Sequence, residues 1–330
     1  MAFVSDCSCE CSKPELDVFS APLTQTSIEA SSYSEYHPLT SLKDANCLEF
    51  EANGSGEDYL DLNNSYLYVR AKVVQENGNN LEAEDAVAPV NNLLHSMFSQ
   101  VDVSLNGTQI SSSTNTYPYR AMIESQLSYG SEAKKTQLAG AMFFKDDAGK
   151  MDAIAVNADA NNGFMARRAK AAGSREFEMM GRIHQDIFFQ DRYIPNNVKL
   201  NLKLIRSRDA FCLMGGAQRK LKITAAKLLV RKVKLSDSVA LAHAKALEEA
   251  TAKFPIKRVV CKPFVIPQGL RDVVQEKLFS GQTPTRLVIG LVENEAFNGS
   301  RQKNPFNFQH FNLSEICMYL DGQLPADHPL

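Results

Sequence analysis

Apolar and polar residues alternate at a period of two in several stretches of this chain. The clearest stretches cover residues 48–52, 67–73, 198–204 and 221–225. A period of two places one face of a strand in a core and the other face in solvent, which is the pattern of antiparallel sheets. Turn-forming pairs punctuate these stretches at Asn53-Gly54, Asn77-Gly78, Asn106-Gly107 and Asp321-Gly322. The pattern therefore predicts an all-β fold of antiparallel strands.

Helical patterns are few. Residues 118–129 open with Pro118, which is favoured in a first helical turn, and they predict one short helix. A second helix is predicted from a cap at Ser236 or Asp237 to about Ala250, with apolar residues along one side. Many strands with sparse helices indicate a sandwich or a jelly roll.

Two long stretches show neither period. Residues 1–40 are rich in Ser, Thr and Pro, so we expect an extended N-terminal arm there. Residues 145–175 are too long for an ordinary connection and predict a functional or mobile surface loop. The loop ends in the basic cluster Arg167-Arg168-Ala169-Lys170, which we expect to be a solvated loop face rather than a phosphate site.

One segment repeats without gaps at an offset of 215 residues (307 minus 92). The identical positions are Asn92, His95, Ser99, Leu105 and Gly107, matched by Asn307, His310, Ser314, Leu320 and Gly322. Both copies predict a polar approach, a strand and a tight turn, so we expect a double jelly roll of two tandem antiparallel β-sandwiches. The second copy ends eight residues after its turn (330 minus 322), so we expect its jelly roll to be incomplete and the chain truncated.

The predicted organisation follows from the repeat. It consists of an N-terminal arm over residues 1–40, a first jelly roll over 41–235, a helical linker over 236–253 and a partial second jelly roll over 254–330.

Composition and charge narrow the function. Hydrophobic residues make up 44% and charged residues 22%, as in soluble globular proteins. The net charge of −2 provides no basic footprint, so no direct binding to nucleic acid is predicted. No run approaches the roughly 20 apolar residues of a membrane helix. The first residues also lack the basic start and apolar stretch of a secretion signal, so we expect synthesis in the cytosol.

The chain lacks the usual catalytic and metal-binding motifs. It contains no H-x-H, H-E-x-x-H, G-x-S-x-G or Gly-rich phosphate loop. We expect His95 and His310 to be hydrogen-bonded histidines at strand entrances rather than ligands. A sandwich glycosidase stays open as an alternative, because its two carboxylates need to be close only in space. No catalytic, cofactor-binding or metal-binding residue is predicted.

The cysteines show no pattern of a metal site. Cys47, Cys212, Cys261 and Cys317 are scattered and predict small core residues in a reducing compartment. The alternating Cys7, Cys9 and Cys11 differ from zinc-finger spacing and predict a reduced arm.

Longer segments resemble one known family. The segments are Cys9-Glu10-Cys11, 15–19, 24–28, 54–62, 92–107, 117–129, 184–191, 204–214 and 254–268. They are similar to the capsid proteins of Polinton (Maverick) transposable elements and the related adintoviruses, over essentially the whole chain. The resemblance implies a hexon-like, double jelly-roll major capsid protein that forms homotrimers and tiles an icosahedral shell, with no enzyme activity and no cofactor.

The resemblance also implies partners and a location. The partners are other copies of the chain, in trimer and shell contacts, and a minor capsid protein. The location is the virion or capsid, with synthesis in the host cytoplasm and assembly there or in the nucleus. Two alternatives stay open: a minor (penton) capsid protein with one jelly roll, and a β-sandwich binding module domesticated by the host. The repeat argues against the first, and the unclustered tyrosines argue against the second.

Overall fold

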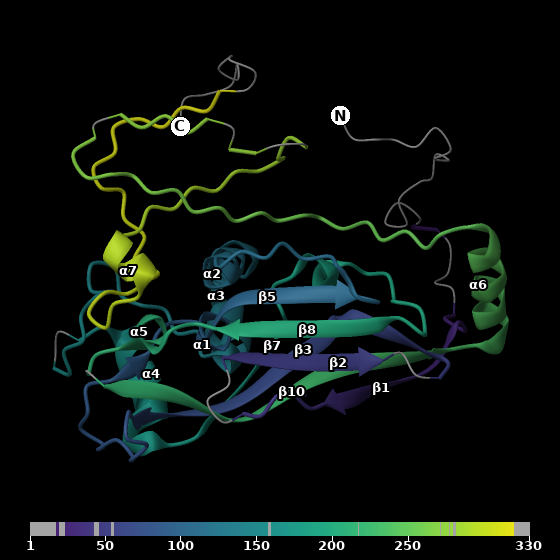
Figure 1. The fold of residues 1–330 in the computed structure, drawn as a ribbon, viewed down its shortest axis with the longest axis horizontal. Coiled ribbons are helices and arrows are strands. Elements are labelled where there is room, and N and C mark those ends of the chain that lie inside the picture. The colour runs from purple at the N-terminus through teal and green to yellow at the C-terminus, as the bar shows by residue number, and fades with distance from the viewer. Residues whose placement is uncertain are drawn as a thin grey trace.

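Strands dominate the structure of this chain (Figure 1). The computed structural model describes residues 18–19, 24–42, 46–53, 56–157, 160–216, 218–270, 272–276, 278–279 and 282–319. One four-stranded sheet has the order β1 (Ile28–Tyr36), β10 (Arg219–Leu235), β3 (Asp58–Gln75), β7 (Phe177–Gly181). A second has the order β2 (Cys47–Asn53), β8 (Lys199–Arg206), β5 (Phe98–Leu105), β6 (Thr108–Gln109). A small third sheet pairs β4 (Ala88–Pro89) with β9 (Leu213–Met214).

The strand pairing of the two larger sheets is that of a jelly roll. The first and last strands of the chain, β1 and β10, pair with each other. The pairs β2–β8, β3–β7 and β5–β6 are formed by strands that lie between them in the sequence. All of these pairs are antiparallel, so the sandwich is a long hairpin of strand pairs rolled into two facing sheets. The prediction of an all-β jelly-roll fold is confirmed.

The core lies between the two sheets and follows the period of two. On β3, Leu67, Val69, Ala71 and Val73 are at most 1% exposed. The facing sheet contributes the buried side chains of Leu200, Leu202, Leu204, Val101 and Val103 to the same cluster. Burial of each large aliphatic side chain stabilises the fold by about 1.5–3 kcal/mol. The alternation therefore tells which face of each strand points inward.

The predicted turn at Asn106-Gly107 connects β5 to β6. Asn106 has φ 48° and Gly107 has φ 79°, so both residues are left-handed. Two successive left-handed residues make a type I′ turn, which matches the twist of a β-hairpin and is why Asn-Gly stands there.

Helices connect the strands at several places in the chain. Both predicted helices are present, as α2 (Tyr117–Ser128) and α6 (Asp237–Glu249). The others are short: α1 (Leu93–Ser96), α3 (Ser131–Lys135), η2 (Gln137–Ala141), α4 (Asn162–Ala171), η3 (Ala172–Ser174), η4 (Asp186–Phe189), α5 (Asp209–Cys212) and α7 (Asn294–Asn298). In the residues described, no helix is both long enough and apolar enough to cross a membrane.

Two predictions about irregular stretches are wrong. Residues 28–36 of the expected N-terminal arm form β1, because they pair with β10 despite showing little alternation of their own. Part of the expected 145–175 surface loop is helix α4, and Arg167 in its basic cluster is fully buried rather than solvated. An edge strand exposed on both faces, and a cation buried against a distant carboxylate, leave no periodic signal in the sequence.

The chain leaves the sandwich after β10. Helix α6 turns it back, and an extended run then crosses to α7 on the opposite side of the molecule (Figure 1). From residue 251 to 319 the described residues contain α7 and no strand. The strand expected within the second copy of the repeat, residues 307–322, is absent from its described part, residues 307–319, where no neighbouring strand offers backbone partners. The turn at 321–322 lies outside the described residues. The second jelly roll over 254–330 stays a prediction.

Candidate functional site: the clamps on the C-terminal segment

Three groups of buried side chains join the sandwich to residues 251–319, which we name the C-terminal segment. The first is an ion-pair network around Asp146 and Arg167. The second is an ion-pair network around Arg120, and the third is an aromatic cluster around Tyr119. Together they determine where this segment lies on the sandwich.

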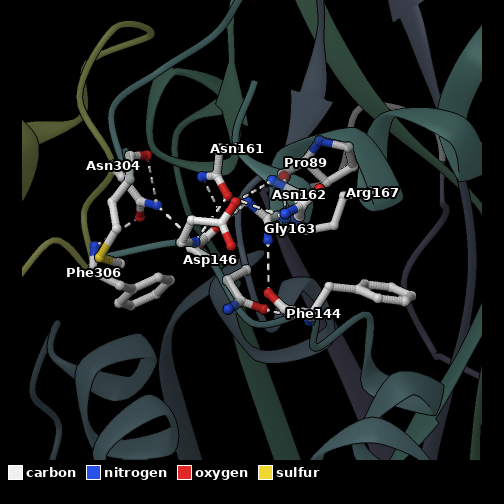
Figure 2. A network of polar contacts seen from close by, with 12 residues as sticks. Pro89, Phe144, Asp146, Asn161, Asn162, Gly163, Arg167, Asn304 and Phe306 are labelled. Atoms are coloured by element: carbon white, nitrogen blue, oxygen red, sulfur yellow. Dashed lines mark hydrogen bonds and ion pairs between the residues drawn. The ribbon is translucent and has the colours of Figure 1, made fainter. Parts of the chain in front are cut away.

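Asp146 and Arg167 form a buried ion pair at the centre of Figure 2. Their side chains are 1% and 0% exposed, and Arg167 Nη2 lies 2.8 Å from Asp146 Oδ1. The guanidinium also donates to the backbone oxygens of Pro89 at 2.8 Å and Phe144 at 3.0 Å. Burial lowers the pKa of Arg167, and the charge of Asp146 opposes that effect. Removing one partner of such a pair leaves an uncompensated buried charge, which is strongly destabilising.

The start of α4 positions Arg167. Asn161 caps the helix by accepting a hydrogen bond from the Gly163 backbone, and its side-chain amide donates to Asp146 at 2.9 Å. A Cβ on Gly163 would stand 2.5 Å from Asp146 Oδ1, so this position has room for glycine alone. The cap thus ties the beginning of the helix to the carboxylate that Arg167, six residues after Asn161, neutralises.

Asn304 connects the C-terminal segment to this network (Figure 2). Its side chain is 0% exposed, and its amide nitrogen donates to Asp146 Oδ2 and to the Met151 backbone oxygen, both at 3.2 Å. Its amide oxygen accepts from the Phe306 backbone nitrogen at 3.0 Å. The backbone nitrogen of Asn304 donates to Asp152 at 2.7 Å. Asn304 is therefore the point where the segment enters the sandwich.

Aromatic packing supports the same attachment. Phe306 is 3% exposed and packs edge-on against Tyr119 of α2 and Phe211 of α5, with ring centroids 5.7 and 6.1 Å apart. Phe297 of α7 stacks on Tyr119 with centroids 5.2 Å apart. Such pairs add to the hydrophobic gain of burial, so this end of the segment is held by apolar as well as polar contacts.

The second network holds the segment 45 residues earlier (304 minus 259). Arg120 of α2 forms ion pairs with Glu124 at 3.0 Å and with Asp186 of η4 at 2.5 Å. The same guanidinium donates to the Val259 backbone oxygen at 3.5 Å, and the Val259 nitrogen donates to Asp186 at 3.2 Å. Burial alone would lower the pKa of Arg120, but the two carboxylates outweigh it and raise that pKa.

Two histidines extend this network into the core. The Tyr117 hydroxyl accepts a hydrogen bond from the His184 backbone nitrogen and lies 3.0 Å from His95 Nδ1, with which it shares a second hydrogen bond. His184 Nδ1 lies 2.6 Å from Glu124 Oε2, and the two imidazole rings meet edge to face at 4.6 Å. Burial, and then the neighbouring His184, hold the pKa of His95 well below its ordinary value. His95 is therefore neutral in the folded protein.

These networks enclose little free space. A hollow beside Arg120, also lined by Tyr117, Gln185 and Val259, has room for about one water molecule, far less than a small-molecule ligand needs. In the part of the chain that is described, no cluster of three or more His, Cys, Asp or Glu side chains is placed to hold a metal. What the arrangement does is fix one extended segment to a sandwich at two points.

The predictions for individual histidines and cysteines are confirmed at some positions and wrong at others. His95 is a hydrogen-bonded histidine just before β5, as predicted. His310 is exposed, and its ring accepts a hydrogen bond from the Asn312 backbone rather than standing at the entrance of a strand. Cys212 is buried, which raises its pKa to about 12, but Cys317 is exposed and was wrongly predicted to be a core residue. The half-buried cysteines are Cys47 and Cys261, and Cys7, Cys9 and Cys11 lie outside the described residues.

We name the polar contacts at Val259 and at Asn304 the clamps. Most of the residues that build them were not predicted from the sequence. Asn161, followed by Asn162-Gly163-Phe164, is a recognisable helix cap, and this signal alone predicts the start of α4. Asn304 carries no comparable signal, because its partner Asp146 is 158 residues away.

The comparisons with known proteins concern the whole chain. No protein-family model matches it. An uncharacterized protein of Caenorhabditis elegans is 26% identical over 321 residues, which make up 94% of this chain and 74% of that protein.

Several solved structures of viral proteins are similar to part of this chain. A chain of the Sputnik virophage has a TM-score of 0.44 and 10% identity, with 70% of this chain and 53% of that chain covered. The Faustovirus major capsid protein has a TM-score of 0.42 and 9% identity, with 70% of this chain and 58% of that chain covered. The mavirus major capsid protein has a TM-score of 0.35 and 10% identity, with 69% of this chain and 52% of that chain covered. This chain thus spans about half the length of those proteins, and a likeness at this identity concerns the fold alone.

Proposed function

We propose that this chain is a structural capsid subunit without catalytic activity, whose copies trimerise and tile an icosahedral shell of a Polinton or adintovirus type of element. One observation carries the proposal: the C-terminal segment offers apolar side chains to solvent along its length. They include Ile256, Val259, Val260, Phe264, Val265, Ile266, Leu270, Val273, Val274, Val288 and Ile289, each 39–85% exposed.

The run that carries these apolar side chains is fixed to the sandwich at both of its ends. The clamps at Val259 and Asn304 hold both ends of the run against the sandwich. Exposed apolar stretches of this extent mark sites of association in soluble proteins. A shell subunit needs such surfaces for its neighbours, whereas an enzyme needs a cavity. The surface therefore supports self-association as the working role.

Further parts of the proposal rest on the sequence resemblance. Residues 254–330 would begin a second jelly roll, a minor capsid protein would join the shell at its vertices, and the protein would reside in the virion. Direct binding to nucleic acid is not part of the role.

The experiment is to purify the chain and measure its mass in solution across nanomolar to micromolar concentrations, with electron microscopy of the largest species. We expect a trimer with a mass of three times 36.6 kDa, together with larger, shell-like particles in the electron micrographs. Val265→Asp with Val274→Asp, at positions 75% and 85% exposed, would disrupt association without unfolding the sandwich. Leu241→Asp, on α6 and 73% exposed, is the matched control. A wild-type chain that stays monomeric at tens of micromolar would refute the proposal.

One observation favours a second candidate. The described residues contain one jelly roll, and a minor capsid protein that forms vertices needs only one. That role predicts a pentamer, five times 36.6 kDa, in the same mass measurement.

A further inference from the structure

Two buried histidines belong to the network around Arg120. The rings of His95 and His184 meet edge to face with their centroids 4.6 Å apart, and the two residues are 3% and 5% exposed. His184 lies against the carboxylate of Glu124, whereas the His95 ring forms its one hydrogen bond, among the residues described, with the Tyr117 hydroxyl. A proton on His95 would therefore be a buried charge that faces a second imidazole and has no carboxylate of its own.

The groups around the two rings leave no carboxylate over for that proton. The titratable and charged side chains that face the rings or their immediate partners are Tyr117, Arg120 and Glu124 of α2, Asp186 of η4, Cys261 of the C-terminal segment, and Arg182, which stacks on the Phe189 ring beside His184. Glu124 is shared between Arg120 and His184, and Asp186 is shared between Arg120 and the Val259 backbone. Burial would raise the pKa of Glu124, but His184 and Arg120 outweigh it and lower that pKa, so Glu124 stays ionised in mildly acidic solution.

Residues 259–261 lie over this network. The extended run that contains them passes over the side of the sandwich that carries α2 and β5 (Figure 1). Val259 holds them there through hydrogen bonds of 3.2 and 3.5 Å to the ion pair of Asp186 and Arg120. The water-sized hollow that they close is also lined by Tyr117, the hydrogen-bond partner of the buried imidazole. Because few bonds hold these residues and they have no regular secondary structure, lifting them is a local opening that brings water to the Tyr117 hydroxyl.

We propose that His95 is an acid-sensitive switch for the clamp at Val259: in mildly acidic solution its ring takes up a proton and residues 255–262 lift from the sandwich, while the clamp at Asn304 stays closed. Burial, and then the neighbouring His184, hold the pKa of His95 well below its ordinary value in the closed state. Water returns that pKa toward about 6.5 once the residues have lifted. The closed state is therefore fully favoured above a pH of about 6.5 and loses its advantage as the pH falls below that value. The switch lies within one copy of the chain, so it does not depend on the capsid role.

Hydrogen exchange of two matched backbone amides tests the switch. The Val259 amide donates to Asp186 at 3.2 Å and the Asn304 amide donates to Asp152 at 2.7 Å, so each amide reports on one clamp. A proton that binds only in the open state, with a pKa of about 6.5, makes opening about tenfold more frequent at pH 5.5 than at pH 7.5. The measurement is the protection factor of each amide, which is corrected for the intrinsic pH dependence of exchange and resolved by fragmentation in a mass spectrometer. We expect the protection factor of Val259 to fall about tenfold over this range and that of Asn304 to change less than about twofold.

Two variants assign the response to His95. His95→Asn keeps a polar group at this position but takes up no proton, so its Val259 protection factor should be the same at both pH values. His243→Asn is the matched control, because His243 is exposed on α6 and also contacts a tyrosine hydroxyl, that of Tyr59 at 3.2 Å. The control variant should respond to pH as the wild-type chain does.

The switch is overturned if the wild-type Val259 amide is equally protected at both pH values, if the Asn304 amide loses protection to the same extent, or if His95→Asn still responds like the wild type. If urea titrations show that His95→Asn is unfolded, the His95 ring of the wild-type chain decides the matter by NMR. Uptake of a proton by that ring with no loss of Val259 protection would then overturn the proposal. All of these measurements use the dilute chain, so their failure leaves the capsid role standing, and a chain that never associates leaves the switch standing.

Discussion

Asn304→Ala is the sharpest test of how the C-terminal segment is attached. The substitution removes the side chain that links the segment to the buried carboxylate of Asp146 and leaves the ion pair with Arg167 in place. Because Asp146 also keeps the donor from Asn161, the sandwich retains most of its network. The expected effect is therefore local opening of the segment rather than global unfolding.

The magnitude follows from three hydrogen bonds. Asn304 donates to Asp146 and to the Met151 backbone, and it accepts from the Phe306 backbone. At a net value of about 1 kcal/mol each, their loss lowers the free energy of local opening by about 3 kcal/mol. Since 1.4 kcal/mol corresponds to a factor of ten, the open population increases about a hundredfold.

Hydrogen exchange of residues 294–308, followed by mass spectrometry, measures this population. We expect exchange of that peptide to accelerate about a hundredfold, while peptides from β3 and β10 stay protected. Asn298→Ala is the control, because Asn298 is exposed and bonds only to Asn294 within α7. Equal exchange in the two variants would refute the reasoning, since it would mean that the buried bonds of Asn304 do not hold the segment.

Three further predictions concern stability. Arg167→Met leaves Asp146 buried without its cation and should lower the free energy of unfolding by about 3–5 kcal/mol in urea titrations, whereas exposed Lys170→Met should leave it within about 0.5 kcal/mol. Gly163→Ala places a Cβ 2.5 Å from that carboxylate, and its thermal midpoint should fall although alanine favours helices. His95 has a pKa lowered by burial, so the unfolded chain binds more protons. Its contribution is present above the unfolded-state pKa of about 6.5 and is lost as the pH falls below that value. His95→Asn should show a correspondingly flatter pH profile of unfolding; an unchanged slope would contradict this.

Local patterns were sufficient for most individual elements. The alternation at 67–73 and 198–204 gives strands and their buried faces, and Asn106-Gly107 gives a type I′ turn, because these properties depend only on neighbouring residues. Helices α2 and α6 also follow from local features, namely Pro118 in the first turn of α2 and the spacing of apolar residues in both, although neither N-cap residue makes a side-chain hydrogen bond. An all-β sandwich follows from these features together.

Tertiary structure alone decided which strands pair and which charges are buried. Strand β1 has little alternation, and it is a strand because β10 lies beside it, roughly 200 residues later in the chain. Arg167 stands in a basic cluster that looks solvated, but the carboxylate of Asp146 and two distant backbone oxygens stabilise it in the core. A period in the sequence tells which face of an element is apolar, and it carries no information about the distant group that completes a hydrogen bond or neutralises a charge.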